Sequence, residues 1–409
     1  MVSGYAIHLF LGRFLGLKMY GVYGLVIGLI NTFILVTTTG IPTAISKYIA
    51  QYPDKAGIIR HKALKLQLAF VFCLTIIYYL SAGVISTYLK DNSLATYLRL
   101  SSAILPIYSL LTIYISYLNG LQEFIRQSVV KIFYSLLKVS LIIFSLAFTG
   151  LGLFGVIGSN ILAPLFTLIL AYSFLPRLSL SPNSSADSDF NAFILIKFAF
   201  PSILYSVAFY LAISLDLYFV KIIRQDNYLV SLYTAASAIS KLPYYLFSGI
   251  ANLGLPLLSN TKGTKSITEF KLSLFSLTKL LLFLLLPSTL FISLLSSRLV
   301  SVLFPSEFLP AALPLSFLVI GLSFFTIFDF FASGFQAYGK PFYPVIAILL
   351  SLPFSVILNW FLIPIYSLTG AALATMLTGL IVLLFSILMF RGNHYLKINA
   401  LWNSPTTTT

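Results

Sequence analysis

The chain has 409 residues, of which 59% are hydrophobic and only 9% are charged, and its mean hydropathy is +0.99. A soluble domain carries roughly 25% charged residues, so this composition excludes a water-soluble globular protein. Twenty-five Lys and Arg residues against 10 Asp and Glu give a net charge of +15. Membrane proteins place such an excess in cytoplasmic loops, so the charge does not indicate a nucleic-acid partner. The single cysteine, Cys73, lies in an apolar run and predicts no disulfide and no cysteine-based metal site.

Apolar runs bounded by Gly, Pro and charged residues predict an all-α polytopic membrane protein with about twelve transmembrane helices. The first run has sixteen residues and rises about 24 Å as a helix, less than the roughly 30 Å of a hydrocarbon core. We therefore expect either a tilted first helix or further residues before Met1. The predicted spans are 2–17, 20–39, 66–86, 94–118, 132–150, 152–176, 193–222, 228–258, 272–297, 310–336, 342–364 and 366–390.

Loop charges predict the orientation of these spans. With the N-terminus in the cytoplasm, the inner segments 40–65, 119–131, 177–192, 259–271, 337–341 and the tail hold fourteen Lys and Arg residues. The opposite loops hold five, namely Lys18, Lys90, Lys221, Arg224 and Arg298. Because positive residues accumulate on the cytoplasmic side, both termini are predicted to be cytoplasmic, in a multi-pass protein of the cell membrane.

The polar stretch "SLSPNSSADSDFN", Ser179 to Asn191, has no apolar periodicity and reads as a linker. It separates six predicted spans from six. The sequence thus predicts an N-terminal six-helix bundle (1–176), a cytoplasmic linker (177–192), a C-terminal six-helix bundle (193–391) and a cytoplasmic tail (392–409).

The two halves repeat a polar phrase. "YLNGLQEFIR" (Tyr117–Arg126) and "FASGFQAYGK" (Phe331–Lys340) each follow an apolar run and place a Gly two positions before a Gln: Gly120 and Gln122, then Gly334 and Gln336. Further landmarks stay in register, since Tyr23 matches Tyr233 and Gly155 matches Gly370. This pattern favours a parallel internal duplication, as in several transporter folds.

Three segments carry a family resemblance. "GRFLGLKMYGVYGLVIGLI" (12–30), "VLFPSEFLPAALPLSFLVIGL" (302–322) and "YSLTGAALATML" (366–377) resemble the polysaccharide flippases of the multidrug/oligosaccharidyl-lipid/polysaccharide exporter superfamily. The resemblance implies two six-helix bundles in a V shape around a central cavity that opens alternately to each side. It also implies that the chain moves lipid-linked oligosaccharides from the cytoplasmic to the outer leaflet.

Ionisable residues at membrane depth usually face a cavity or a partner. Three cations, Arg13, Lys138 and Lys241, are the candidates for binding the phosphates of an anionic cargo, because Arg and Lys replace lost hydration with charge-assisted hydrogen bonds. Arg13 also matches an Arg in the first helix of the family that the chain resembles. The alternative for each cation is a structural pair with an Asp or with helix carbonyls.

Two deep carboxylates, Asp216 and Asp329, allow two interpretations. They are either sites for a coupling H⁺ or Na⁺, or counter-ions for Lys241 and Lys138, and the sequence slightly favours the counter-ions. The scattered His8, His61 and His394 form no ligand cluster, and no other cofactor or metal is indicated.

We therefore expect a secondary transporter, not an enzyme, whose cargo is an anionic lipid-linked oligosaccharide. Its expected surroundings are membrane lipids and, as partners, the glycosyltransferases and polymerase of the same pathway. Two alternatives stay open at this point: a cation antiporter for drugs or metabolites in the same superfamily, and a non-transporting scaffold of an envelope polysaccharide complex. A membrane-embedded glycosyltransferase would need an acidic or His-bearing extramembrane site, which the loops 40–65 and 177–192 do not provide.

Overall fold

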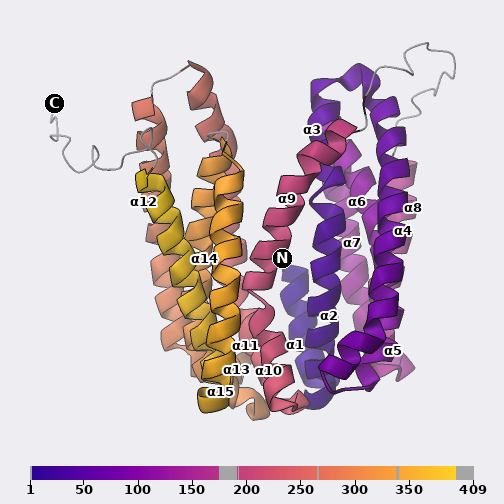
Figure 1. The fold of residues 1–409 in the computed structure, drawn as a ribbon. Helices are drawn as coiled ribbons and strands as arrows, with labels where there is room; N and C mark the ends of the chain where they lie inside the picture. The colour runs from indigo at the N-terminus through magenta and orange to yellow at the C-terminus, as the bar shows by residue number, and fades with distance from the viewer. Residues whose placement is uncertain (1, 175–190, 192, 265–266, 338–339, 393–409) are drawn as a thin grey trace. The chain divides into compact units, whose positions relative to one another are not determined.

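The computed structural model describes residues 2–174, 191, 193–264, 267–337 and 340–392 (Figure 1). These residues form helices, and no strand occurs among them. The α-helices are α1 (Val2–Phe14), α2 (Leu17–Thr38), α3 (Ile41–Gln51), α4 (Ala56–Tyr88), α5 (Ser93–Ser101), α6 (Ile104–Gly120), α7 (Phe124–Phe144), α8 (Gly152–Ser173), α9 (Phe193–Ala212), α10 (Leu215–Arg224), α11 (Asn227–Thr264), α12 (Ile267–Leu294), α13 (Ser296–Leu303), α14 (Ala312–Ala337) and α15 (Phe342–Gly392).

The prediction of an all-α polytopic membrane protein is confirmed. Within the described residues, nine helical segments are long and apolar enough to cross a bilayer. One of them, Phe342–Met389, contains a break at Ser367, whose φ of 53° is not helical. That segment therefore consists of two helices, whereas α1 has only 13 residues. The total of twelve spans stays a prediction.

Three predicted segments differ from the observed helices. Residues 40–65, taken as a loop, contain α3 and the start of α4, whereas 94–118 and 193–222 are each broken into two helices, α5–α6 and α9–α10. Helix α3 was not recognised in the sequence because only one of its faces is apolar. Its buried side chains include Ile41, Ala44, Ile45 and Ile49. Gly40 precedes α3 and Pro42 stands in its first turn, where a missing N–H costs nothing.

The chain divides by packing into two units: Met1–Tyr210 with Arg224–Thr234, and Leu211–Ile223 with Ala235–Thr409. We call them the first and second unit. The proposed boundary at the linker differs from this division, because most of α9 packs with the first unit. The predicted linker and tail lie outside the described residues, apart from Asn191 and Gly392, and the assignment of two six-helix bundles stays a prediction.

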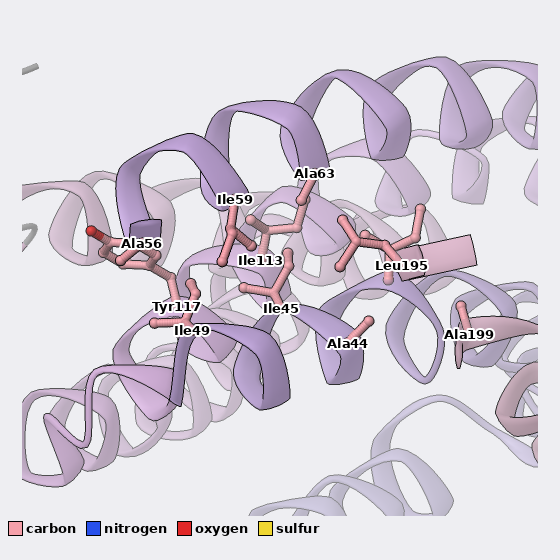
Figure 2. Close-up of a cluster of buried hydrophobic side chains, with 11 residues drawn as sticks. Ala44, Ile45, Ile49, Ala56, Ile59, Ala63, Ile113, Tyr117, Leu195 and Ala199 are labelled. Atoms are coloured by element: carbon pink, nitrogen blue, oxygen red, sulfur yellow. The ribbon is translucent and has the colours of Figure 1, made fainter. Parts of the chain in front are cut away.

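The packing of α9 is visible in an apolar cluster of the first unit (Figure 2). Leu195 and Ala199 of α9 pack there with buried residues of α3, α4 and α6, among them Ile45 and Ile113. Each of these four side chains is at most 3% exposed. Burial of such side chains stabilises the contact by about 25 cal/mol for each Å² of apolar surface removed from solvent, although lipid tails weaken that driving force where they are the alternative neighbour.

The repeated landmarks have similar local surroundings in the two units. Gly120 is the last residue of α6, and Gly334 lies in the last turn of α14. Gly155 and Gly370 each follow a break, at Gly150 and at Ser367, both with positive φ. A Cβ on Gly155 would lie 1.7 Å from the Ser145 Oγ, and one on Gly370 would lie 2.1 Å from the Leu362 carbonyl oxygen. Both glycines therefore let a helix start close against the end of the preceding one.

Candidate functional site

The second unit holds a buried polar cluster around Asp216. Asp216 lies in the first turn of α10, where the helix dipole stabilises a negative charge, and its side chain is 3% exposed. One carboxylate oxygen accepts a hydrogen bond from the Thr375 hydroxyl on α15 at 2.6 Å, and the other accepts the Leu217 N–H at 2.8 Å. Hydrogen bonds to an ionised carboxylate are among the strong ones, so this acid is held firmly between two elements 159 positions apart.

Lys241 on α11 is the cation near this carboxylate. It is half-buried, and Asp216 is close enough to act on it electrostatically. Among the described residues, the structure therefore brings one predicted acid and one predicted cation together, as the counter-ion interpretation requires. The binding of a coupling ion by Asp216 stays a prediction.

Lys221 adds a second cation to α10. It was counted above with the loop charges, but it lies inside α10 and only 2% of its surface is exposed. The assignment of Lys221 to a loop was wrong, because residue 221 lies inside α10 and also inside the predicted span 193–222. The cytoplasmic segments then hold fourteen Lys and Arg residues and the opposite loops hold four. The predicted orientation is therefore unchanged.

Asp329, the other predicted acid, lies in α14 and is half-buried. The phenol of Tyr244 on α11 is near enough to interact electrostatically with its carboxylate. The Ser333 hydroxyl donates to the Asp329 backbone carbonyl at 3.2 Å, and not to the carboxylate. Asp329 thus lies in the second unit and Lys138 in the first, and the proposed pairing of these two residues stays a prediction.

In the first unit, Lys138 lies in the middle of α7 and is half-buried. It makes no hydrogen bond or ion pair within the part of the chain that the structure describes. Glu123, at the start of the same helix, forms an ion pair with Arg126. Tyr134 is one helical turn before Lys138, so both side chains lie on one face of α7. The ring of Tyr134 packs 5.5 Å from that of Tyr108 on α6, centroid to centroid.

A second aromatic group of the first unit surrounds His8 on α1. The His8 Nδ1 and the Tyr20 hydroxyl form a hydrogen bond of 2.9 Å, and the ring centroids of Tyr20 and Tyr23 lie 6.0 and 5.9 Å from the imidazole. Tyr23 in turn interacts electrostatically with Tyr134 of α7. Sequence analysis found no role for His8, because its partners are 12 and 15 positions away and on a different helix.

Arg13, the remaining predicted cation, lies in the last turn of α1. Its side chain is exposed, and a positive charge at this end of a helix interacts favourably with the helix dipole. α1 packs against α7, the helix of Lys138. The first unit therefore presents two cations and several phenol groups on neighbouring helices, a set of donors suited to phosphate and sugar hydroxyls.

The described residues contain no group of three or more His, Cys, Asp and Glu side chains that could hold a metal ion. The donors of both units are Lys, Arg, Thr and Tyr groups with single carboxylates. Such donors bind anions and polar groups of a cargo more readily than they coordinate a transition metal.

Comparisons with known proteins agree with the fold. A family model described as polysaccharide biosynthesis protein matches residues 4–262. No curated protein sequence matches the chain significantly. Among solved structures, the chain is similar to the inward-facing conformation of a multidrug resistance MATE family transporter of the MOP superfamily, with 15% identity and a TM-score of 0.79 over 95% of this chain and 94% of that chain.

Two further structures are similar over nearly the whole chain. The lipid II flippase MurJ in an inward closed conformation has 18% identity and a TM-score of 0.75, over 98% of this chain and 88% of that chain. The outward-facing conformation of a multidrug resistance MATE family transporter has 17% identity and a TM-score of 0.74, over 98% and 93%. At these identities the likeness concerns the fold alone. The chain thus belongs to the polysaccharide biosynthesis protein family and has the fold of the MOP superfamily.

Proposed function

We propose that the protein is a secondary transporter that flips an anionic lipid-linked oligosaccharide from the cytoplasmic to the outer leaflet by alternating access. The family match to polysaccharide biosynthesis proteins and the likeness to the lipid II flippase support this cargo class. The protein acts in the cell membrane with both termini in the cytoplasm, beside the glycosyltransferases and polymerase that make and extend the glycan.

The observation that carries the proposal is the charge of Lys138. A cation at membrane depth is costly unless an anion compensates it, and Lys138 has no acidic partner within the described residues. The pyrophosphate of a lipid carrier is such an anion. Tyr134, one turn away, and Tyr108 next to it supply hydroxyl donors for the same phosphates or for the first sugar.

Arg13 and Lys241 are the other two cations that we propose bind the anionic cargo. Arg13 at the end of α1 supplies a planar guanidinium for bidentate phosphate contacts. Lys241 supplies a second-unit cation that Asp216 neutralises while no cargo is bound. A cation antiporter would require the opposite arrangement, with carboxylates in excess.

The test is transport of lipid-linked oligosaccharide in proteoliposomes by three variants of α7. Lys138→Ala and the isosteric Lys138→Met remove the charge, and Lys131→Ala removes an exposed cation two turns earlier on the same helix as the matched control. Losing one contact to a charged group costs on the order of 1.5–3 kcal/mol, or roughly ten- to a hundred-fold in affinity. Lys131→Ala transports normally.

Stability separates a binding role from a structural one. Replacing an uncompensated buried charge with an apolar side chain leaves a protein equally or more stable, so Lys138→Met loses transport without losing thermal stability. Normal flipping by Lys138→Met, or by the Arg13→Ala, Lys241→Ala double variant, contradicts the role of the cations. Uptake of a cationic dye without any lipid flipping favours the antiporter, and intact polysaccharide synthesis without flipping in vesicles favours the scaffold.

Coupling is tested with the same vesicles under an imposed H⁺ or Na⁺ gradient. If Asp216 carries the coupling ion, Asp216→Asn binds the lipid but no longer responds to the gradient. If Asp216 is only the counter-ion of Lys241, the Asp216→Asn, Lys241→Met double variant keeps its gradient response. The two interpretations thus predict opposite outcomes.

A further inference from the structure

A second group of donors lies in the first unit, at the ends of α3, α4, α6 and α8 that the predicted topology places in the cytoplasm. The guanidinium of Arg60, in the second turn of α4, lies 5.0 Å from the ring centroid of Tyr117 on α6. Tyr114, one turn earlier on α6, interacts electrostatically with Arg60 and with Tyr172 of α8. The rings of Tyr114 and Tyr172 meet edge to face, with centroids 6.2 Å apart.

The hydroxyl of Tyr117 is the atom of this group that best indicates a bound molecule. The Tyr117 side chain is 0% exposed, and its hydroxyl has no hydrogen-bond partner. In Figure 2 the hydroxyl oxygen of Tyr117 lies at the edge of the apolar cluster, on the side of Ala56 at the start of α4. A buried hydroxyl without a partner costs about 1–3 kcal/mol, so a structure keeps one where another molecule satisfies it or where the phenol has a different use.

The group is positively charged and lacks an acidic partner. Arg60 makes no ion pair within the described ranges, where Glu123 is engaged by Arg126. Arg60 is half-buried, and exposed or half-buried cations follow it on α4 at Lys62 and Lys65. A guanidinium and phenol hydroxyls are donors for the oxygens of a phosphate, which accepts several hydrogen bonds at once.

The position indicates a lipid as the source of that phosphate. Tyr172 is 66% exposed on α8 and shares its exposed face with Ile169, which is 65% exposed, and Phe166, which is 48% exposed. Such an apolar exposed face on a membrane helix faces acyl chains. Phosphate donors therefore lie beside a lipid-facing surface, at the depth where Tyr side chains meet headgroups. Anionic lipids of the cytoplasmic leaflet are attracted by basic residues at this depth.

We propose that Arg60, Tyr114, Tyr117 and Tyr172 form a binding site for the phosphate headgroup of an anionic membrane phospholipid. The Tyr117 ring supports the guanidinium by a cation–π contact. The phosphate accepts from Arg60 and from the phenol hydroxyls, including the Tyr117 hydroxyl once Arg60 turns toward the headgroup. The acyl chains lie along the exposed face of α8. The proposal does not depend on the proposed transport function.

The experiment uses the purified full-length protein, stripped of lipid in detergent and titrated with phosphatidylglycerol or phosphatidylcholine while native mass spectrometry counts bound lipids. Wild type is expected to bind phosphatidylglycerol with higher affinity than phosphatidylcholine. Arg60→Gln weakens phosphatidylglycerol binding by about ten-fold or more, as expected for the loss of a charge-assisted contact. Arg126→Gln is the matched control, because its guanidinium lies 3.4 Å from Glu123, and it binds like wild type.

Tyr117→Phe separates the site from a structural role. In the absence of a ligand, removal of an unpartnered hydroxyl leaves the melting temperature of the lipid-free protein unchanged or raises it. If the hydroxyl binds the headgroup, the same variant loses part of the stabilisation that phosphatidylglycerol gives to wild type. A Tyr117→Phe variant that melts lower without lipid, yet gains as much from phosphatidylglycerol as wild type, contradicts the proposal.

Three further results overturn the proposal. The first is equal binding of phosphatidylglycerol and phosphatidylcholine, which indicates an apolar contact only. The second is undiminished phosphatidylglycerol binding by Arg60→Gln. The third is preferential binding of an isoprenoid pyrophosphate, abolished by Arg60→Gln, with no response to phosphatidylglycerol. That result assigns the donors to a carrier lipid and not to a membrane phospholipid.

Discussion

The hydrogen bond from Thr375 to Asp216 joins α15 to α10, and its contribution to stability can be measured. Thr375→Val removes the hydroxyl and keeps the shape of the side chain, so the carboxylate loses the donor that lies at 2.6 Å. Both side chains are almost fully buried, at 1% and 3% exposure. Hydrogen bonds to charged groups contribute on the order of 1.5–3 kcal/mol, and we expect Thr375→Val to lower the free energy of unfolding of the second unit by about 2 kcal/mol.

Thr378→Val is the matched control. Thr378 is one turn further along the same helix and 0% exposed, but its hydroxyl donates to the Ala374 carbonyl of its own helix at 2.7 Å. Such bonds back to the preceding turn contribute little to stability, so we expect a loss of less than about 0.5 kcal/mol. The difference between the two variants isolates the contact with Asp216.

The assay is unfolding in mixed micelles by increasing mole fraction of dodecyl sulfate, followed by circular dichroism. A double-mutant cycle with Asp216→Asn gives the coupling energy of the pair, which we expect to be about 1.5 kcal/mol or more. Equal effects of Thr375→Val and Thr378→Val, with a coupling energy below about 0.3 kcal/mol, would refute the inference that the Thr375 hydroxyl holds Asp216.

Three further predictions concern topology, assembly and packing. Ser185→Cys in the linker should not be labelled by an impermeant thiol reagent from outside intact cells, and external labelling would reverse the proposed orientation. Coexpressed fragments 1–184 and 185–409 should co-purify, because Leu195 and Ala199 of the second fragment pack against α3, α4 and α6 of the first. Leu195→Asn should weaken that association. Fragments that both insert into the membrane but never associate would contradict the prediction. Gly370→Ala should destabilise the protein by about 1–3 kcal/mol, since its Cβ would lie 2.1 Å from a backbone oxygen, whereas Gly158→Ala, with nothing within 4 Å, should be neutral in thermal unfolding.

The linear sequence was sufficient for the membrane class and the all-α architecture, whereas the twelve spans and the two-part repeat stay predictions. These features depend on local composition, because the cost of placing a helix in a bilayer is a sum over its own residues. The same holds for Lys138 and Asp216, which stand out because a charge inside an apolar run is costly wherever the run lies. A strongly one-sided helix such as α3 was missed for the same reason, since its average composition resembles that of a loop.

Tertiary structure alone decided which of these residues meet. Thr375 lies in the segment 366–377, and nothing in the sequence marks it as a partner of a buried acid. Its hydroxyl nevertheless donates to Asp216, which is 159 positions away. The burial of Lys221, the packing of α9 with the first unit and the Arg60–Tyr117 contact likewise depend on how helices cross. An apolar helix packs equally well in many orientations, because neighbouring lipid and protein are similarly apolar. Only the assembled helices determine which face carries a partner, and therefore which charges are compensated within the described chain.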